Sequence, residues 1–152
     1  MVRLVFNYPE DEDVARFVEA GNILTGAIVD RSGGLALIHI GNKEIEAISD
    51  LPAGKNVTVC LRHEDITLSL PAQSPETTSA RNRLSGKVIR IFPTSSQVRI
   101  TIDVGFPLVA LITRRSWYEI GLEAGREVTA TFKASSIHLI GHFLCKSTAY
   151  LA

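Results

Sequence analysis

The pentapeptide NILTG at residues 22–26 returns as NRLSG at residues 82–86, an offset of 60 residues. The tripeptide AIV follows the first copy, and KVI follows the second. A second pair, LPAGKNV at residues 51–57 and LEAGREV at residues 122–128, repeats with an offset of 71 residues. Self-similarity that returns in the same order indicates two copies of one structural unit. The chain therefore predicts a tandem repeat.

The residue pattern of each copy is typical of a small β unit. From residue 21 onward, short runs rich in Val, Ile and Thr alternate with Gly and Pro, which is typical of short strands joined by tight turns. Each copy offers about five strands, and a sheet of that size avoids exposed edges most easily by curling into a barrel. We therefore expect an all-β protein with two small OB-like five-stranded barrels in tandem.

The difference between the two offsets locates an insertion in the second copy. The second copy has 11 extra residues, which fit the segment TRRSWYEIG at residues 113–121. Trp117 and Ile120 are three residues apart there, as in one helical turn. We expect a short helix inserted in the second barrel. In the repeated Leu-x-Ala-Gly-x-x-Val, the glycine is expected to take a positive φ in a turn.

The rest of the chain divides around these two barrels. Residues 10–20 place apolar side chains on one face, with acidic residues in the first turn, where the helix dipole favours them. The stretch PAQSPETTS at residues 71–79 is rich in Pro, Ser and Thr, as linkers are. The predicted division is a connecting helix at 1–21, a first barrel at 22–70, a linker at 71–78, a second barrel at 79–141 and a C-terminal tail at 142–152.

Composition and charge exclude several classes of protein. Lys plus Arg and Asp plus Glu number 16 each, so the net charge is zero. That balance argues against binding to nucleic acid, which requires many neutralised phosphates. No apolar run approaches the roughly 20 residues that span a bilayer, and the N-terminal residues do not resemble a signal peptide. We expect a cytoplasmic protein without direct membrane contact.

The residues that could catalyse a reaction or bind a metal do not form a recognisable motif in the sequence. The chain has no G-x-x-x-x-G-K-[ST] motif, so it is not expected to hydrolyse ATP. His138 and His142 are four residues apart, but their surroundings predict a strand rather than a helix, and that spacing suits metal ligands only on a helix. Cys60 and Cys145 lie in apolar stretches and are expected to be buried thiols. We expect no enzyme activity, no metal and no cofactor.

Three polar clusters fit the needs of a tetrahedral oxyanion. Such a dianion requires convergent hydroxyls, backbone N–H groups and one or two cations. Taken alone, each cluster also has an ordinary structural explanation, as a strand start, a helix N-cap or a turn. The predicted oxyanion-binding residues are Ser79, Ala80, Arg81 and Asn82 before the second barrel, Thr113 and Ser116 at the inserted helix, and Lys133, Ala134 and Ser135 after the last repeated strand.

These clusters carry a resemblance to a known family. Residues 79–140 resemble the Mop (molybdenum-pterin-binding) module, whose pieces are Ser-Ala-Arg-Asn, Thr-x-x-Ser before a short helix, a Leu-x-x-Gly turn and Lys-Ala-Ser-Ser. Residues 22–70 resemble the related TOBE (transport-associated OB) barrel, with RHED at 62–65. Residues 5–26 resemble the stretch that joins an ABC ATPase domain to that barrel. Together the chain resembles the C-terminal regulatory region of a molybdate/tungstate ABC importer ATP-binding subunit.

The resemblance implies a function. Molybdate or tungstate would be the ligand, held at an interface between barrels or subunits in a homodimer. The barrels would form the intracellular regulatory domain of an importer and inhibit transport when the anion is abundant. The partners would be an ABC ATPase domain, absent from this chain, and through it the membrane permease, with a location peripheral to the inner membrane. The first barrel departs from the pattern, because Glu64 and Asp65 would repel a dianion.

Two further functions stay open at this point. Mop barrels also occur in free cytosolic molybdate-binding or storage proteins and in the ligand-sensing half of molybdate-responsive transcription regulators. A nucleic-acid-binding OB barrel is disfavoured, because it requires a basic groove with stacking aromatic residues, and only 7% of the residues are aromatic.

Overall fold

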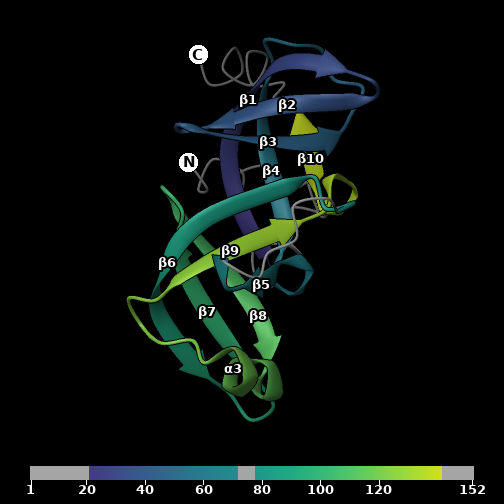
Figure 1. The fold of residues 1–152 in the computed structure, drawn as a ribbon. Helices are drawn as coiled ribbons and strands as arrows, with labels where there is room; N and C mark the ends of the chain where they lie inside the picture. The colour runs from purple at the N-terminus through teal and green to yellow at the C-terminus, as the bar shows by residue number, and fades with distance from the viewer. Residues whose placement is uncertain (1–20, 72–77, 142–152) are drawn as a thin grey trace, which may run out of the picture.

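The fold consists of two five-stranded antiparallel sheets, which confirms the expected all-β class with OB-like units (Figure 1). The computed structural model describes residues 21–71 and 78–141. The first sheet has the order β10 (His138–Gly141), β4 (Asn56–Arg62), β1 (Gly21–Ser32), β2 (Leu35–Ile40) and β3 (Lys43–Ile48). The second has the order β5 (Thr67–Ser69), β9 (Glu127–Phe132), β6 (Asn82–Pro93), β7 (Gln97–Asp103) and β8 (Pro107–Thr113).

The two halves of the chain exchange their last strands. Strand β5 follows β4 in the sequence but pairs with β9, and β10 follows β9 but pairs with β4 (Figure 1). The short 3-10 turns η1 (His63–Asp65) and η3 (Ala134–Ser136) direct this exchange, because η1 packs against β8 and η3 packs against β3. The sheets therefore do not coincide with the segments 22–70 and 79–141, and each sheet is completed by the other half.

The long strands β1 and β6 bend in the same way. Each has 12 residues and pairs with two neighbours, with an irregular register at Ile28 in β1 and at Val88 in β6. The repeated Leu-x-Ala-Gly turns dock at these bends. The N–H groups of Gly54 and Gly125 donate to the carbonyl oxygens of Ile28 and Val88 over 2.6 and 2.7 Å, and their φ angles are 92° and 90°. The predicted positive φ is confirmed in both copies.

The glycine that ends each repeated pentapeptide allows a neighbouring strand to approach closely. A Cβ atom added to Gly26 would lie 2.7 Å from Cγ2 of Ile38. A Cβ atom added to Gly86 would collide with the carbonyl oxygen of Asp103 and lie 2.8 Å from Cγ1 of Val104. Both distances are too short for a real side chain. Close strand packing therefore explains why the pentapeptide is repeated with its glycine.

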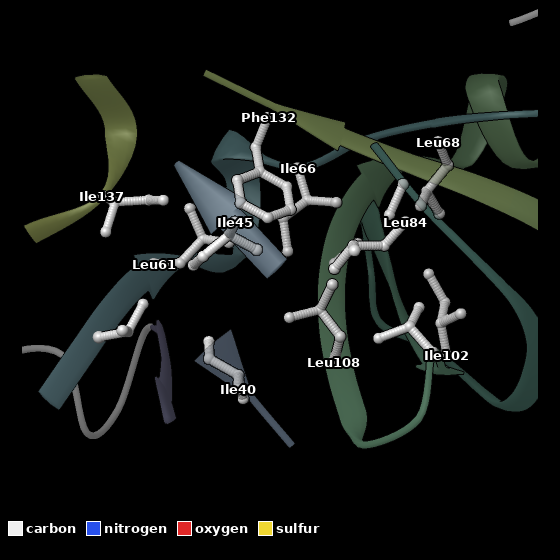
Figure 2. Packing of buried hydrophobic residues seen from close by; sticks show 14 of the residues in the cluster. Ile40, Ile45, Leu61, Ile66, Leu68, Leu84, Ile102, Leu108, Phe132 and Ile137 are labelled. Carbon is white, nitrogen blue, oxygen red and sulfur yellow. The ribbon is translucent and has the colours of Figure 1, made fainter. Parts of the chain in front are cut away.

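One hydrophobic core extends through both halves. Figure 2 shows buried members of this cluster that come from strands of both sheets. They include Ile45 of β3, Leu61 of β4, Leu84 of β6, Leu108 of β8 and Phe132 of β9. Because side chains from both sheets share this core, neither half buries its apolar face independently of the other.

Two buried asparagines join the halves at the edges of the sheets. Asn22 Nδ2 donates to the carbonyl oxygen of Val109 over 2.9 Å, and the N–H of Val109 donates to Asn22 Oδ1 over 2.8 Å. Asn82 makes the same pair with Glu46, where the N–H donates to Oδ1 over 2.7 Å and Nδ2 donates to the carbonyl oxygen over 2.9 Å. Strands β8 and β3 are edge strands, so each amide takes the place of a missing neighbouring strand.

The inserted helix is confirmed as α3 (Arg114–Ile120). Thr113 is its N-cap, and Gly121 ends it with a φ of 75°. Trp117 Nε1 donates to the carbonyl oxygen of Leu122 over 3.0 Å and so fixes the chain that leaves the helix. The predicted connecting helix, most of the linker and the tail fall on residues 1–20, 72–77 and 142–152, which lie outside the described residues.

The amide of Asn22 gives a test of the connection between the halves. Replacing Asn22 by Ala leaves the N–H and carbonyl of Val109 without their partner, which costs about 1–3 kcal/mol for a buried polar group. We expect the free energy of unfolding, measured in urea, to fall by about that amount. Asn56→Ala, an exposed position, is the matched control and should change it by less than about 0.5 kcal/mol. Equal effects of the two substitutions would contradict the account.

Candidate functional site

Two of the three predicted clusters meet at one end of the second sheet. Asn82, the first residue of β6, pairs with Phe132, the last residue of β9. The segment before Asn82 and the segment after Phe132 therefore leave the sheet together. Ser79, Ala80 and Arg81 on one segment, and Lys133, Ala134 and Ser135 on the other, therefore lie beyond the same end of the β6–β9 pair.

Most of the polar side chains at this end are exposed to solvent. Arg81, Lys133, Ser79 and Ser135 are exposed, whereas Ala134 is buried and anchors the turn η3. Within the turn, the N–H of Ser136 donates to the carbonyl oxygen of Lys133 over 3.0 Å. The first N–H groups of a helical turn have no partner inside it, so the start of η3 offers backbone donors next to its N-cap residue Lys133.

Asn82 lies at the centre of this region with a different role from its neighbours. The residue is 3% exposed, and both polar atoms of its side chain bond the backbone of Glu46. The amide thus positions strand β3 of the other half against the start of β6. Asn82 belongs to the predicted set, and the structure places it as the residue that connects the cluster to the first sheet.

Glu46 is a member of this region that the sequence did not indicate. Arg81 Nε donates to Glu46 Oε1 over 2.7 Å, and Arg81 Nη2 donates to Oε2 over 3.4 Å. The hydrogen bond and the negative charge of Glu46 raise the pKa of Arg81. The two residues are 35 positions apart and lie in different halves, so no local pattern links them. The contact of the Asn82 side chain with the backbone of Glu46 holds strand β3 beside Arg81.

A hollow of about 220 Å³ adjoins the Arg81–Glu46 pair. Arg31 provides a second guanidinium there, and it donates to the carbonyl oxygen of Ser49 over 3.2 Å. The carboxylates of Asp30 and Glu46 offset the two arginine charges, so the hollow is not strongly basic. The lining residues are Asp30, Arg31, Ser32, Leu35, Leu37, Glu46 and Arg81.

The third predicted cluster is not part of this region. Thr113 Oγ1 accepts from the N–H of Ser116 over 3.1 Å and donates to Ser116 Oγ over 3.0 Å, which is an N-cap interaction. Figure 1 shows α3 at the opposite end of the second sheet from the turn that precedes β10. The structure therefore gives Thr113 and Ser116 a capping role and does not bring them to Arg81 and Lys133.

The equivalent position in the first half has different chemistry. Arg62 and Glu64 form an ion pair of 3.2 Å where the second half has Lys133 and Ser135. Hydrogen bonding by the backbone of Glu64, aided by Arg62, lowers the pKa of this carboxyl group, so it stays charged. His63 is buried, and burial followed by the charge of Arg99 lowers its pKa. A carboxylate here opposes an anion, in keeping with the prediction for the first barrel.

The described segments contain neither a group of metal ligands nor a membrane-spanning helix. Residues 21–71 and 78–141 contain no group of three or more His, Cys, Asp or Glu side chains that could hold a metal ion. His138 lies in strand β10, as the sequence predicted, and Cys60 is buried in β4. Within the same residues, no helix is long and apolar enough to cross a membrane.

Comparison with known proteins indicates the class of protein to which this chain is similar. Residues 78–139 match the family model of the TOBE domain. The match lies on the second half and does not cover residues 22–70, for which the sequence resemblance predicts the TOBE barrel. Almost the whole chain is homologous to proteins named molybdate/tungstate import ATP-binding protein WtpC.

The relatives are longer than this chain. WtpC of Pyrococcus horikoshii is 39% identical over 139 residues, which are 91% of this chain and 37% of that protein. WtpC of Pyrococcus abyssi is 41% identical over 137 residues, 90% of this chain and 37% of that protein. The molybdenum import ATP-binding protein ModC of Mannheimia succiniciproducens is 38% identical over 85 residues, 55% of this chain and 24% of that protein. The chain thus spans little more than a third of the WtpC relatives.

A solved structure has the same fold. The cytoplasmic molybdate-binding protein ModG, in a form with molybdate bound, superposes with a TM-score of 0.71 at 23% identity. The superposition covers 78% of this chain and 94% of the ModG chain. The architecture of two joined OB-like units is therefore shared with ModG.

The buried His63 predicts a pH dependence of stability. Because its pKa is lowered below 6.5 in the folded chain, the unfolded chain binds the proton more readily, and stability falls as the pH drops below that value. We expect the free energy of unfolding to decrease between about pH 7.5 and about pH 5.5. In His63→Gln that decrease should be smaller. The same pH slope in both proteins would show that His63 is not the cause.

Proposed function

We propose that this chain binds molybdate or tungstate as the intracellular regulatory domain of an ABC importer ATP-binding subunit. The observation that carries the proposal is the pairing of Asn82 with Phe132, because Ser79–Asn82 and Lys133–Ser135, both of the predicted oxyanion set, then lie at the same end of the β6–β9 pair. The homology to molybdate/tungstate import ATP-binding proteins supports the choice of ligand. The proposed role is binding and not catalysis.

The chemistry of these groups suits a tetrahedral dianion. Arg81 and Lys133 supply two positive charges, and Ser79 and Ser135 supply hydroxyl donors. Backbone N–H groups at the start of η3 add donors of fixed direction. These two cations attract a dianion locally without a strongly basic surface, which fits a chain whose net charge is zero.

The exposure of the site supports a homodimer. The Arg81 side chain is 55% exposed, and exposed ionic contacts are weak because water and salt screen them. A second copy of the chain that covers this surface would exclude water and strengthen every contact to the anion. We therefore propose that the anion lies between two copies, as the family resemblance implies.

The regulatory step follows from binding at such an interface. An anion that binds one dimer arrangement better than the other shifts the population toward that arrangement. Through an attached ABC ATPase domain and the membrane permease, this shift would inhibit import when the anion is abundant. In this proposal the domain works in the cytoplasm, peripheral to the inner membrane. The names of the WtpC and ModC relatives support an ATPase partner.

A free molybdate-binding or storage protein is the second candidate function. The similarity to ModG, which extends over 94% of the ModG chain, favours it specifically. Binding by the free chain fits both candidates, whereas only the regulatory domain should change the ATPase rate of an importer subunit to which it is joined. The ligand-sensing half of a transcription regulator is distinguished in the same way, because anion binding would then change DNA binding and not the ATPase rate.

Calorimetric titration with molybdate and tungstate tests the proposed function. The 152-residue chain should bind both anions, and light scattering should report a dimer in the bound state. Arg81→Ala and Lys133→Ala should each weaken binding by about 10- to 100-fold, the usual cost of losing one hydrogen bond to a charged group.

The matched control is Arg90→Ala, which removes an exposed arginine from the same strand β6. It should leave the affinity within about threefold of the wild type, since Arg90 lies outside the cluster. Absence of binding by the wild type, or equal loss in all three variants, would contradict the proposed function.

A further inference from the structure

We propose that the carboxylate of Glu46 is an internal counter-ion that competes with the oxyanion for Arg81 and so limits the affinity of the site. This inference rests on the proposed function, because it concerns the same anion. It adds a residue from the first half of the chain to a site that the sequence placed wholly in the second.

The position of Glu46 is fixed by its backbone. Both its N–H and its carbonyl oxygen are bonded to the side chain of Asn82, over 2.7 and 2.9 Å. Arg81 is the chain neighbour of Asn82, so the same contact places the guanidinium beside the carboxylate. The ion pair is therefore a consequence of the way in which the halves are joined.

The pair occupies the groups of Arg81 that an anion would use. Nε and Nη2 of Arg81 point to the two carboxylate oxygens, over 2.7 and 3.4 Å. A guanidinium binds a tetrahedral oxyanion best through two adjacent N–H groups. An oxyanion that takes this edge must displace the carboxylate, and an anion that takes another edge still lies within a few ångströms of a like charge.

The surroundings allow the carboxylate to be displaced. Its side chain is 29% exposed, and the bonds that hold strand β3 involve the backbone of Glu46 and not its carboxylate. The hollow of about 220 Å³ beside the pair gives the side chain space to move, with Arg31 as an alternative partner on its wall. Release of Glu46 thus leaves the joint between the halves intact.

Strand β3 also provides a matched control. Glu44 lies two residues from Glu46 on the same exposed face and has its own basic partner, His39, at 2.7 Å. It lines a separate hollow together with Arg83 and Ser85. Removing the charge of Glu44 changes the net charge of the chain by the same amount as removing the charge of Glu46, without freeing Arg81.

The experiment compares molybdate affinity by calorimetry in the wild type, Glu46→Gln and Glu44→Gln at the same salt concentration. Glu46→Gln should bind about tenfold more tightly, the scale of removing one like charge a few ångströms from an anion near a protein surface. Glu44→Gln should stay within about threefold of the wild type. Glu46→Ala should also bind molybdate more tightly, and its stability should be measured by urea unfolding alongside. This second variant still tests the counter-ion role if Glu46→Gln folds poorly.

The outcomes separate this inference from the proposed function. Binding by the wild type with unchanged or weaker binding by both Glu46 variants would overturn the counter-ion role and leave the proposed function standing. Equal tightening by Glu44→Gln and Glu46→Gln would also overturn it, because the effect would then be one of overall charge. If neither the wild type nor any variant bound molybdate or tungstate, the proposed function and this inference would both fail.

Discussion

The side-chain amides of Asn22 and Asn82 are the contacts on which the arrangement of the two halves depends. Each amide gives one donor and one acceptor to an edge strand of the other half, so two backbone groups that would otherwise be orphaned are satisfied. The exchanged strands β5 and β10 reinforce this joint, because each completes a sheet to which it does not belong by sequence. The shared hydrophobic core then makes the two OB-like units one folded body.

Which residues make up the candidate site depends on this contact between the two halves. Arg81 and Lys133 come from the second half, but Asn82 places Glu46 of the first half directly beside Arg81. A local change in how β3 lies against the start of β6 therefore changes the charge that faces an anion. This physical link between the packing of the halves and the electrostatics of the site suits a domain whose proposed role is regulation.

The sequence predicted the features that depend on local chemistry. The repeat, the turn glycines such as Gly54 and the inserted helix after Thr113 each follow from a short pattern, and the structure confirms them. The strand exchange could not be predicted, because β4 and β9 are copies of the same strand and offer the same edge to either terminal strand. The role of Glu46 was missed because it lies 35 residues from Arg81 in the sequence and comes near it only through the packing of the two halves.

The most direct test of the central claim is a crystal structure with tungstate, located by its anomalous scattering. The account predicts a tungsten peak within hydrogen-bonding reach of Arg81, Lys133 and Ser135, with the Glu46 carboxylate turned away from the guanidinium. A peak confined to the start of α3 near Thr113, or to the Arg62 position of the first half, would contradict it.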